Sequence, residues 1–557
     1  MRLTLVQPPN GLYDHAELCP PLGLLTIATA VEEDGVDVSL VDFNLRGQRY
    51  PGFLLDRFYE NATRAIAATE PDVVGFTSMV VESHVSLELA RRIKATDPGV
   101  VTVLGGPHFT AIARETLELY PWVDYVVTGE GEAATRSLLR YLAGKAGPSE
   151  LVNVARRAHG EVILDRVVKP EATLRTLPSP AYHLVDLTHY FTTNPRQLLD
   201  YEAGRGCIFR CSFCYSPVHW GQGEQVKGVD RVTGDVLRLR DLGARTLFFV
   251  QDNFLNSVAA AKALCHSLAE ANTGLTWNCY GTLPQLTADM LDALAAAGCD
   301  SVFVGVDAIS PTAQQNFAKH FFKGWERLRE RLQTCLDRGV VPTCAFMIDF
   351  PTEDDTSTNA ALQTALLARN LGCGFRLNTL SVYNQTATAL ALRDRPRTYT
   401  EIVPRLLLDT PDVIHENPYA REHPELFPYH STFLPVPFYE RFVTSMSIAF
   451  TLYNWFPRTL LSYVVEDNGS LWQLLDHLAS QAGDLTVVHP LLRQAEEATL
   501  LVRELPRRAL SSATRRAFAL ELDVLQPQQE AVAAGSASPA VAGGREGGDT
   551  RASARSA

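Results

Sequence analysis

The sequence predicts an α/β protein in which a doubly wound parallel sheet is followed by a partial (βα)6 barrel and a mostly helical C-terminal region. Strand-like apolar runs alternate with helical runs twice, over residues 1–145 and again from about residue 197. From about residue 395 the pattern becomes helical and rich in aromatic side chains. The 557 residues are too many for one core and suffice for three domains of ordinary size.

The composition excludes several classes of protein. Hydrophobic residues make up 46% of the chain and charged residues 20%, which is typical of a globular protein and not of a fibrous or wholly disordered one. No run approaches the ~18 consecutive apolar residues that span a bilayer, and residues 1–15 lack the apolar region of a signal peptide. We therefore expect a cytoplasmic protein without a membrane partner. The formal charge of −13 argues against a large nucleic-acid surface.

The first series contains five strand-like runs separated by helical ones, which predicts a doubly wound domain over residues 1–145. The strand-like runs cover residues 2–7, 36–43, 72–78, 99–106 and 123–132. Sheets of this kind bind ligands beyond the carboxyl ends of their strands. The residues expected at those ends are Pro8, Pro9, Ser78, Gly105, Gly106, Gly129 and Gly131.

Residues 146–196 are expected to form a connector that includes a hairpin around Gly160. The second series follows over residues 197–394, where six strand-like runs with helical runs between them predict an open, partial barrel. These runs cover residues 197–204, 244–252, 275–281, 301–307, 341–350 and 375–383. Catalytic groups of such barrels lie on the loops that follow the strands.

Residues 395–525 are expected to form a helical domain. Its many aromatic residues are interpreted as a packed core, with a cap over the substrate as the alternative. Residues 526–557 are rich in Ala, Gly, Ser and Pro and show no apolar period, so we expect them to be disordered.

Three cysteines lie within eight residues directly after the first barrel strand: Cys207, Cys211 and Cys214, spaced C-x3-C-x2-C. Thiolates are soft ligands that suit zinc or iron–sulfur clusters. Three thiolates can hold three irons of a [4Fe–4S] cubane, which ordinarily has four cysteine ligands, and would leave one iron open. The competing interpretations are a structural zinc with His219 as fourth ligand, and three unrelated cysteines. The other seven cysteines are scattered, and several lie in apolar runs as small buried hydrophobes.

The motif resembles the signature of the radical S-adenosylmethionine (SAM) superfamily, in which an aromatic residue, here Phe213, precedes the third cysteine. The resemblance implies that the open iron chelates SAM and that an electron from the cluster cleaves SAM to a 5′-deoxyadenosyl radical. It also implies that Phe213 flanks the adenosine. Such a radical abstracts hydrogen from an unactivated carbon, which no side chain can do.

Other positions resemble the family's SAM-binding motifs with departures. Gln251, Asp252 and Asn253 occupy the place of the motif that holds the methionine amine, and Asp307 stands where a ribose contact is common. Residues 347–353 resemble the adenine motif, with Asp349 in place of its glycine, and residues 381–390 resemble a Y-P-G-T run with Asn384 and Gln385 in place of Pro-Gly.

Residues 1–145 resemble the cobalamin-binding domain that precedes many radical SAM enzymes. Glycines at strand ends let the backbone approach a broad, flat ligand, although a glycine pair can also form a simple tight turn. Ser78 would bond the nucleotide tail. The D-x-H-x-x-G motif that ligates cobalt is absent, and His108 is interpreted as structural. We therefore expect bound cobalamin to lack a protein histidine ligand, and a more degenerate domain would bind none.

Together these resemblances imply a cobalamin-dependent radical SAM enzyme with a [4Fe–4S] cluster, SAM and cobalamin as cofactors. The expected activity is C-methylation of a natural-product precursor, with one SAM remethylating cobalamin and a second providing the radical. The alternatives are a non-methylating cyclase or rearrangement enzyme, polar methylation of an aromatic carbon, and a cobalamin or iron–sulfur sensor. The expected partners are a small-molecule or peptide substrate and a reductase or flavodoxin-type electron donor.

Overall fold

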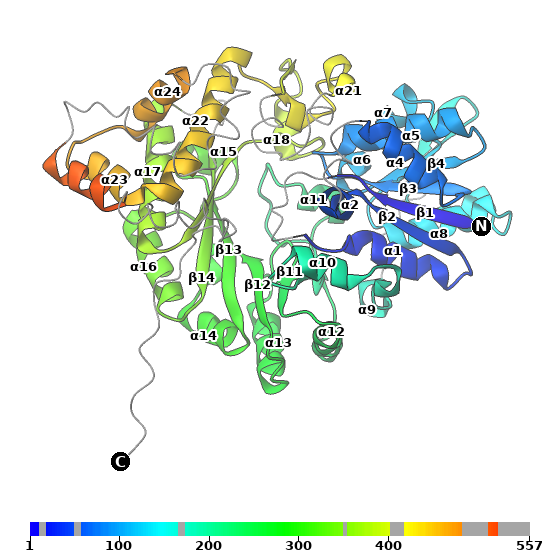
Figure 1. Ribbon diagram of the computed structural model, residues 1–557, viewed down its shortest axis with the longest axis horizontal. Coiled ribbons are helices and arrows are strands. Elements are labelled where there is room, and N and C mark those ends of the chain that lie inside the picture. Colours follow the sequence, from blue (N-terminus) through cyan, green and yellow to red (C-terminus); the bar gives the residue numbers. More distant parts are fainter. Residues whose placement is uncertain are drawn as a thin grey trace.

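The computed structural model describes residues 1–9, 18–49, 57–164, 173–348, 354–401, 417–481 and 511–521. It contains two large sheets, each flanked by helices, and C-terminal elements that extend along both (Figure 1). The predicted α/β class is confirmed. Asp349 and the tail 526–557, about which the sequence made predictions, lie outside the described residues.

The first sheet has seven strands in the order β2-β1-β3-β4-β5-β6-β7. The strands are β1 (Arg2–Gln7), β2 (Asp37–Asp42), β3 (Val73–Thr77), β4 (Val101–Gly105), β5 (Tyr125–Val127), β6 (Val154–Ala158) and β7 (Glu161–Leu164). Strands β1 to β5 are parallel, as predicted. The hairpin predicted around Gly160 is formed by β6 and β7, and it extends this sheet in antiparallel sense.

Both faces of the first sheet are covered, because side chains alternate along each strand. In β1, Leu3 and Leu5 pack toward α1 and α8, whereas Val6 packs with the core beneath α4 and α5. The helices of this domain are α1 (Leu22–Glu32), α2 (Phe43–Arg49), α4 (Phe58–Ala67), α5 (Ser83–Thr96), α6 (Pro107–Ala111), α7 (Ala113–Leu119) and α8 (Gly131–Leu142). The chain leaves β1 for β2 on one side and returns to β3 on the other, which makes a topological switch point.

Two short helices, α9 (Thr173–Thr176) and α10 (Leu187–Thr193), lead to the second sheet, whose six strands are all parallel. Its order is β8-β11-β12-β13-β14-β15, which confirms the predicted partial barrel. The strands are β8 (Leu198–Tyr201), β11 (Thr246–Phe249), β12 (Thr276–Gly281), β13 (Cys299–Asp307), β14 (Val341–Ile348) and β15 (Gly374–Thr379). The helices are α12 (Val229–Asp241), α13 (Val258–Glu270), α14 (Ala288–Ala296), α15 (Pro311–Asn316), α16 (Trp325–Leu336) and α17 (Asp355–Leu371).

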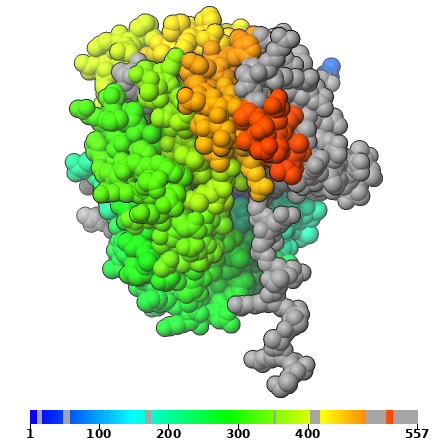
Figure 2. Space-filling model, turned by 90° about the vertical axis from the view of Figure 1, so that its left-hand side faces the viewer, coloured from blue at the N-terminus to red at the C-terminus, as the bar shows by residue number. Residues whose placement is uncertain are grey.

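The C-terminal region is mostly helical in its described parts, as predicted. Its elements are α18 (Ala387–Ala391), β16 (Thr398–Tyr399), α21 (Pro418–Glu422), β17 (Ser431–Thr432), α22 (Val436–Trp455), α23 (Pro457–Val465) and α24 (Leu471–Gln481). Helices α22 to α24 share one core with the barrel, and Figure 2 shows the orange C-terminal helices directly on the green barrel surface. Around α21, by contrast, Tyr419 and Phe427 pack into the core of the first domain.

The C-terminal region therefore contacts both halves of the molecule. Among the described residues, no helix combines the length and the apolar character needed to cross a bilayer.

Candidate active site

The three clustered cysteines lie on a loop, residues 206–215, that we call the cysteine loop. It follows β9 (Gly204–Arg205) and ends at α11 (Ser216–Trp220), and β9 pairs with β10 (Gln225–Val226) to close its base. Cys207, Cys211 and Cys214 are free and partly exposed. Six of the other seven cysteines are buried, which confirms that several scattered cysteines act as small hydrophobes.

Burial raises the pKa of all three thiols, that of Cys214 to about 12, and the neighbouring thiols add to the shift for Cys211 and Cys214. Since a thiolate is the form that binds a metal, iron bound here would have to stabilise the deprotonated sulfurs.

The residues after β11 hold the cysteine loop in place. Asp252 Oδ2 accepts a hydrogen bond from the Gly206 amide at 2.9 Å, and Asn256 accepts one from the Ile208 amide at 3.2 Å. The buried Asn253 donates to Asn256 at 3.0 Å. Asp252 thus bonds the cysteine loop directly, and Asn253 bonds Asn256, which in turn bonds the loop. Contact of Asp252 or Asn253 with SAM stays a prediction.

Two segments that come later in the chain form hydrogen bonds with Ser212 of the cysteine loop. Ser212 donates its amide to Phe317 O at 3.0 Å and accepts a hydrogen bond from the Thr388 hydroxyl at 3.0 Å. Thr388 belongs to the 381–390 run that resembles a family motif, so this run does reach the cysteines. The rings of Phe213 and Phe317 meet edge to face at 5.0 Å.

A buried ion pair between Asp307 and Lys319 lies beside the cysteines. Asp307 ends β13 in the left-handed region, at φ +51°, and the Lys319 ammonium lies 6.0 Å from the centre of the Phe213 ring. Burial lowers the pKa of Lys319, but the charges of Asp307 and Cys211 outweigh it and raise the pKa above its ordinary value.

Sequence reasoning missed Lys319. The available signal was its residue type, because lysine is scarce in this chain and arginine is common. A ribose contact by Asp307 stays a prediction, since the partner that the structure gives its carboxylate is Lys319.

The residues predicted at the strand ends of the first domain do lie at one edge of its sheet. Pro8 and Pro9 follow β1, Ser78 follows β3, Gly105 ends β4 and Gly106 follows it, and Gly129 and Gly131 follow β5. Ser78 is buried and shares a hydrogen bond with the Ser86 hydroxyl at 2.6 Å. Its contact with a nucleotide tail, like the cobalamin role of the other six residues, stays a prediction.

Gly106 has a clear structural requirement. Its φ of +90° and ψ of 179° belong to a region that only glycine adopts readily. A Cβ atom there would lie 2.7 Å from both the amide nitrogen and the carbonyl oxygen of Ser78. The absence of a side chain therefore lets two strand ends of the first domain approach each other closely.

His108 is buried against aromatic rings, with its ring centre 5.5 Å from that of Phe427, and burial lowers its pKa to about 3. This environment agrees with the structural interpretation. His219, the fourth ligand of the zinc alternative, instead packs between Tyr215 and Trp220, and burial lowers its pKa to about 4.

Within the described ranges, no three His, Cys, Asp or Glu side chains converge on a point that could hold one metal ion. The chemistry and the C-x3-C-x2-C spacing of the three cysteines fit a [4Fe–4S] cluster with one iron that lacks a cysteine.

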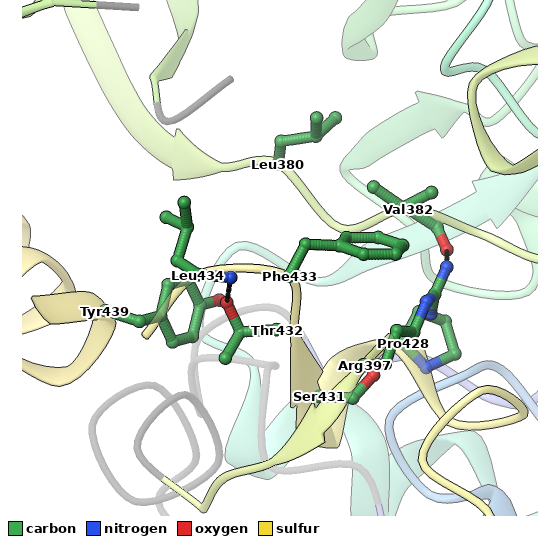
Figure 3. A pocket seen from close by; sticks show the side chains of 9 residues that line it. All are labelled: Leu380, Val382, Arg397, Pro428, Ser431, Thr432, Phe433, Leu434 and Tyr439. Atoms are coloured by element: carbon green, nitrogen blue, oxygen red, sulfur yellow. Dashed lines mark hydrogen bonds between the residues drawn. The ribbon is translucent and has the colours of Figure 1, made fainter. Parts of the chain in front are cut away.

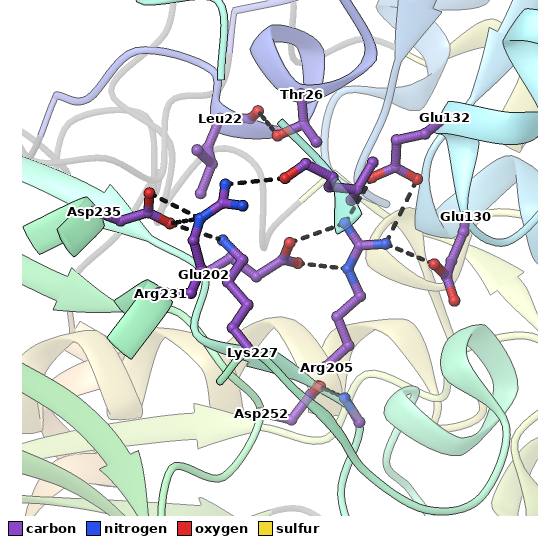
Figure 4. A network of polar contacts seen from close by, with 12 residues as sticks. Leu22, Thr26, Glu130, Glu132, Glu202, Arg205, Lys227, Arg231, Asp235 and Asp252 are labelled. Carbon is purple, nitrogen blue, oxygen red and sulfur yellow. Dashed lines mark hydrogen bonds and ion pairs between the residues drawn. The ribbon is translucent and has the colours of Figure 1, made fainter. Parts of the chain in front are cut away.

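The cysteine loop and the carboxyl edge of the first sheet are joined by a buried network of charges around Arg205 (Figure 4). The Arg205 guanidinium donates to Glu130 at 2.7 Å and to Glu132 at 2.6 Å, both from the first domain, and to Glu202 at 2.8 Å. It also lies over the Trp220 ring at 5.1 Å. Burial is the main cause that raises the pKa of Glu130.

A second contact between the domains is made by Tyr215, whose hydroxyl donates to Pro107 O. Arg205 stands two residues before Cys207, and the two acidic partners flank Gly131. The two strand-end edges that the sequence marked as candidate ligand sites are thus adjacent in space.

Two family models match the chain. The B12 binding domain matches residues 15–139, and the radical SAM superfamily matches residues 201–365. An uncharacterized methyltransferase of Pyrococcus horikoshii is 24% identical over 66% of this chain and 78% of the relative. The cytidylyl-2-hydroxyethylphosphonate methyltransferase of Streptomyces wedmorensis is 27% identical over 55% of this chain and 65% of the relative, so the alignment spans just under two thirds of that protein.

The structure of TsrM from Kitasatospora setae, a radical S-adenosylmethionine methyltransferase with cobalamin and a [4Fe–4S] cluster bound, shares the fold. It matches with a TM-score of 0.59 and 18% sequence identity, over 89% of this chain and 99% of that chain.

Proposed function

The chain is a cobalamin-dependent radical SAM enzyme, and we propose that it transfers a methyl group from cobalamin to an unactivated carbon of a small natural-product precursor. Its cofactors are a [4Fe–4S] cluster, SAM and cobalamin. The relatives that are named as methyltransferases support the choice of reaction, and the nature of the carbon and of the precursor belongs to the proposal.

The observation that carries the proposal is the contact between the cysteine loop and the carboxyl edge of the first sheet. Glu130 and Glu132 lie beside Gly129 and Gly131 at that edge, and Arg205 binds both carboxylates. A methyl transfer that uses both cofactors requires that one substrate reach both. The cysteine loop and the carboxyl edge of the first sheet are adjacent, which supports such a reaction. A sensor would not need the two cofactor sites to face one substrate.

When bound, the cluster and SAM would supply a radical at carbon, and cobalamin would supply the methyl group. The chain's own residues would hold and shield these groups. Cys207, Cys211 and Cys214 would hold the iron, and Phe213, the residue before Cys214, packs edge to face on Phe317. The Lys319 ammonium would offset part of the negative charge of three thiolates in a region of low polarity.

Aromatic side chains between the two edges would exclude water from the reaction. The rings of Tyr215 and Tyr383 lie 6.3 Å apart, and Tyr383 packs with Tyr429 and with Val80 and Val81 of the first domain. A site that generates a radical must keep out solvent and other hydrogen donors, because side reactions would quench it. We propose that a flavodoxin-type reductase delivers the electron from outside.

The experiment is an anaerobic incubation of the reconstituted full chain with SAM carrying a deuterated methyl group and a low-potential reductant. S-Adenosylhomocysteine together with 5′-deoxyadenosine, in amounts that rise with an added substrate, is the expected result. A Cys207→Ala, Cys211→Ala, Cys214→Ala variant should release no 5′-deoxyadenosine.

Two other patterns would redirect the proposal. S-Adenosylhomocysteine alone would indicate polar methylation. Release of 5′-deoxyadenosine with a rearranged product that lacks deuterium would indicate a cyclase or rearrangement enzyme. A wild-type protein that cleaves no SAM with any candidate substrate would overturn the proposal.

A further inference from the structure

Asp307 and Lys319 form an ion pair beside the cysteine loop, and the local backbone is shaped to hold it. Asp307 ends β13 after a β-bulge, because Gly305 pairs with Ala345 of β14 and Asp307 pairs with the next residue of that strand. Bulges re-aim side chains and are common next to active sites. Asp307 has a φ of +51°, and Ala318, the residue before Lys319, has a φ of +50°. One partner of the pair thus occupies a strained backbone position and the other directly follows one, and such positions cluster at functional sites.

Gly305 leaves the space that this ion pair occupies. A Cβ atom on Gly305 would lie 2.5 Å from Lys319 Nζ and 2.6 Å from Asp307 Oδ2. The two charged side chains are 8% and 9% exposed, so the pair is almost fully removed from water. A buried ion pair is often no more stabilising than apolar residues of the same size. Stability alone therefore does not explain why the end of β13 is built around two charges.

The segment that leads to Lys319 is bonded to the cysteine loop. The Ser212 hydroxyl donates to Asn316 O at 2.6 Å, and the Ser212 amide donates to Phe317 O at 3.0 Å. Lys319 Nζ lies 6.0 Å from the centre of the Phe213 ring. Ser212 and Phe213 stand between the second and third cysteines of the loop. The ammonium group is therefore held next to the part of the loop that carries these two cysteines.

The ion pair presents its positive end to the cysteines. Burial raises the pKa of the Cys211 thiol, and among the nearby charges Lys319 opposes this rise, whereas Asp307 adds to it more weakly. Burial also raises the pKa of Cys207, and Lys319 again opposes the rise. The pair is neutral as a whole, but its cation acts on the cysteines more strongly than its anion does.

Apolar side chains beside the cysteine loop limit the screening of this charge by water. Phe317, Leu380 and Val382 belong to one buried apolar cluster, and Phe213 and Phe433 pack against it. Figure 3 shows Leu380, Val382 and Phe433 around a small pocket that they line. Charges interact more strongly through an apolar region than through water. The positive charge beside Phe213 is therefore weakened less at the iron site than an exposed charge would be.

We infer that Lys319 raises the reduction potential of the cluster that the three cysteines would hold, and that Asp307 positions Lys319 and limits the rise. In the reduction, an external reductant loses one electron and the [4Fe–4S] cluster passes from the 2+ to the 1+ state. The cluster gains a negative charge, which a nearby cation stabilises. Lys319 thus sets how strong a reductant is needed before SAM can be cleaved. This inference rests on the proposed function, in that it takes the cysteines to hold the cluster.

The test is an anaerobic redox titration of the reconstituted full chain without SAM or substrate, in which the EPR signal of the reduced cluster is measured against potential. Lys319→Met should favour the oxidised cluster by about 10-fold, because a unit charge within about 10 Å acts strongly in a region of low polarity. For a one-electron couple this is a shift of about 59 mV to lower potential. Lys319→Arg keeps the charge and should keep most of the wild-type potential. Asp307→Asn removes the opposing charge and should raise the potential.

Lys323→Met is the matched control, because Lys323 lies four residues after Lys319 and is exposed. Water and salt screen its charge, so the potential should equal that of the wild type. Iron and acid-labile sulfide per chain show whether each variant has assembled its cluster. If Lys319→Met assembles none, the double variant Asp307→Asn, Lys319→Met takes its place, because it leaves no unpaired buried charge. Its potential should still lie below that of the wild type, since the cation acts on the cysteines more strongly than the anion.

The inference fails if removal of the Lys319 charge does not lower the potential, if Lys319→Arg lowers it as much as Lys319→Met does, or if Asp307→Asn does not raise it. A change in packing or in water access alone would move the two single variants in the same direction. SAM and substrate are absent from the titration, so neither SAM binding nor methyl transfer affects the readout. A wild-type protein that assembles no cluster would overturn the proposed function as well, whereas the expected shifts without methyl transfer would overturn the proposed reaction alone.

Discussion

Arg205 and Glu132 form a buried ion pair between the two halves of the molecule, with Nη2 and Oε1 2.6 Å apart. The side chains are 5% and 6% exposed. Glu130 and Glu202 bind the same guanidinium, so three carboxylates surround one cation. Arg205 lies two residues before Cys207, and Glu132 follows Gly131 at the carboxyl edge of the first sheet. The ion pair therefore holds the cysteine loop beside that edge.

Arg205→Met should destabilise the protein by about 3–5 kcal/mol, because it leaves two buried carboxylates and the half-buried Glu202 without their cation. Chemical denaturation measures the change. Arg196→Met is the matched control, since Arg196 is half exposed and pairs with Asp300 at 3.5 Å, and it should cost under about 1 kcal/mol. Equal effects of the two variants would show that Arg205 does not join the domains.

Lys319 and Asp307 should behave as one unit. Lys319→Met and Asp307→Asn each remove one partner of a buried pair and should each cost about 3–5 kcal/mol. The double variant should cost clearly less than the sum, because it leaves no unpaired charge. A double-mutant cycle in denaturant measures this coupling, and additive effects would contradict it.

Cys214→Ala should abolish assembly of the iron–sulfur cluster, since two thiolates cannot replace three ligands on one loop. Iron and acid-labile sulfide per chain measure the loss after anaerobic reconstitution. Cys265→Ala is the control, because Cys265 is buried in the barrel core, and it should retain the full content. Full iron content in Cys214→Ala would remove this cysteine from the ligand set.

Gly106→Ala should weaken both folding and cobalamin binding. A Cβ at this position meets the Ser78 backbone at 2.7 Å, and the backbone conformation is itself strained for alanine, so the cost should exceed about 2 kcal/mol. Gly160→Ala is matched in φ, at +80°, but a Cβ there meets nothing within 4 Å. It should cost only about 1 kcal/mol. Equilibrium titration with cobalamin and denaturation of both variants distinguish the two effects.

Glu82 should make the protein less stable as the pH rises. Burial raises its pKa from 4.5 to about 7, and its Oε2 has no hydrogen-bond partner. The unfolded chain therefore loses this proton at lower pH than the folded protein does. The folded state is penalised progressively between about pH 4.5 and pH 7, and the penalty is complete above that range.

Glu82→Gln removes this group and should stabilise the protein at alkaline pH by up to roughly 3 kcal/mol. Below the pKa of the unfolded chain the two proteins should be nearly equal. Denaturant midpoints of both proteins across this pH range measure the difference, and a difference that does not change with pH would refute the assignment to Glu82.

Local patterns were sufficient to predict much of this protein. The alternation of apolar residues identified β1 and β3 as buried strands, since a strand covered on both faces needs apolar side chains in both directions. The spacing of Cys207, Cys211 and Cys214 predicted a cluster site, and the structure shows that all three lie on one loop. The hairpin at Gly160 was also visible, but its addition to the first sheet was not, because the partner of an edge strand is chosen by the whole fold.

The sequence by itself predicted the strands of both sheets and the burial of most scattered cysteines, because these properties depend on neighbours within a few residues. The iron-binding role of the three clustered cysteines stays a prediction. Only the tertiary structure decided that Arg205 binds Glu132 and that Lys319 binds Asp307. Such contacts join loops at the carboxyl ends of strands far apart in the chain. The physical reason is that a charge in a sequence has no preferred partner until the sheets bring particular loops together and remove the water between them.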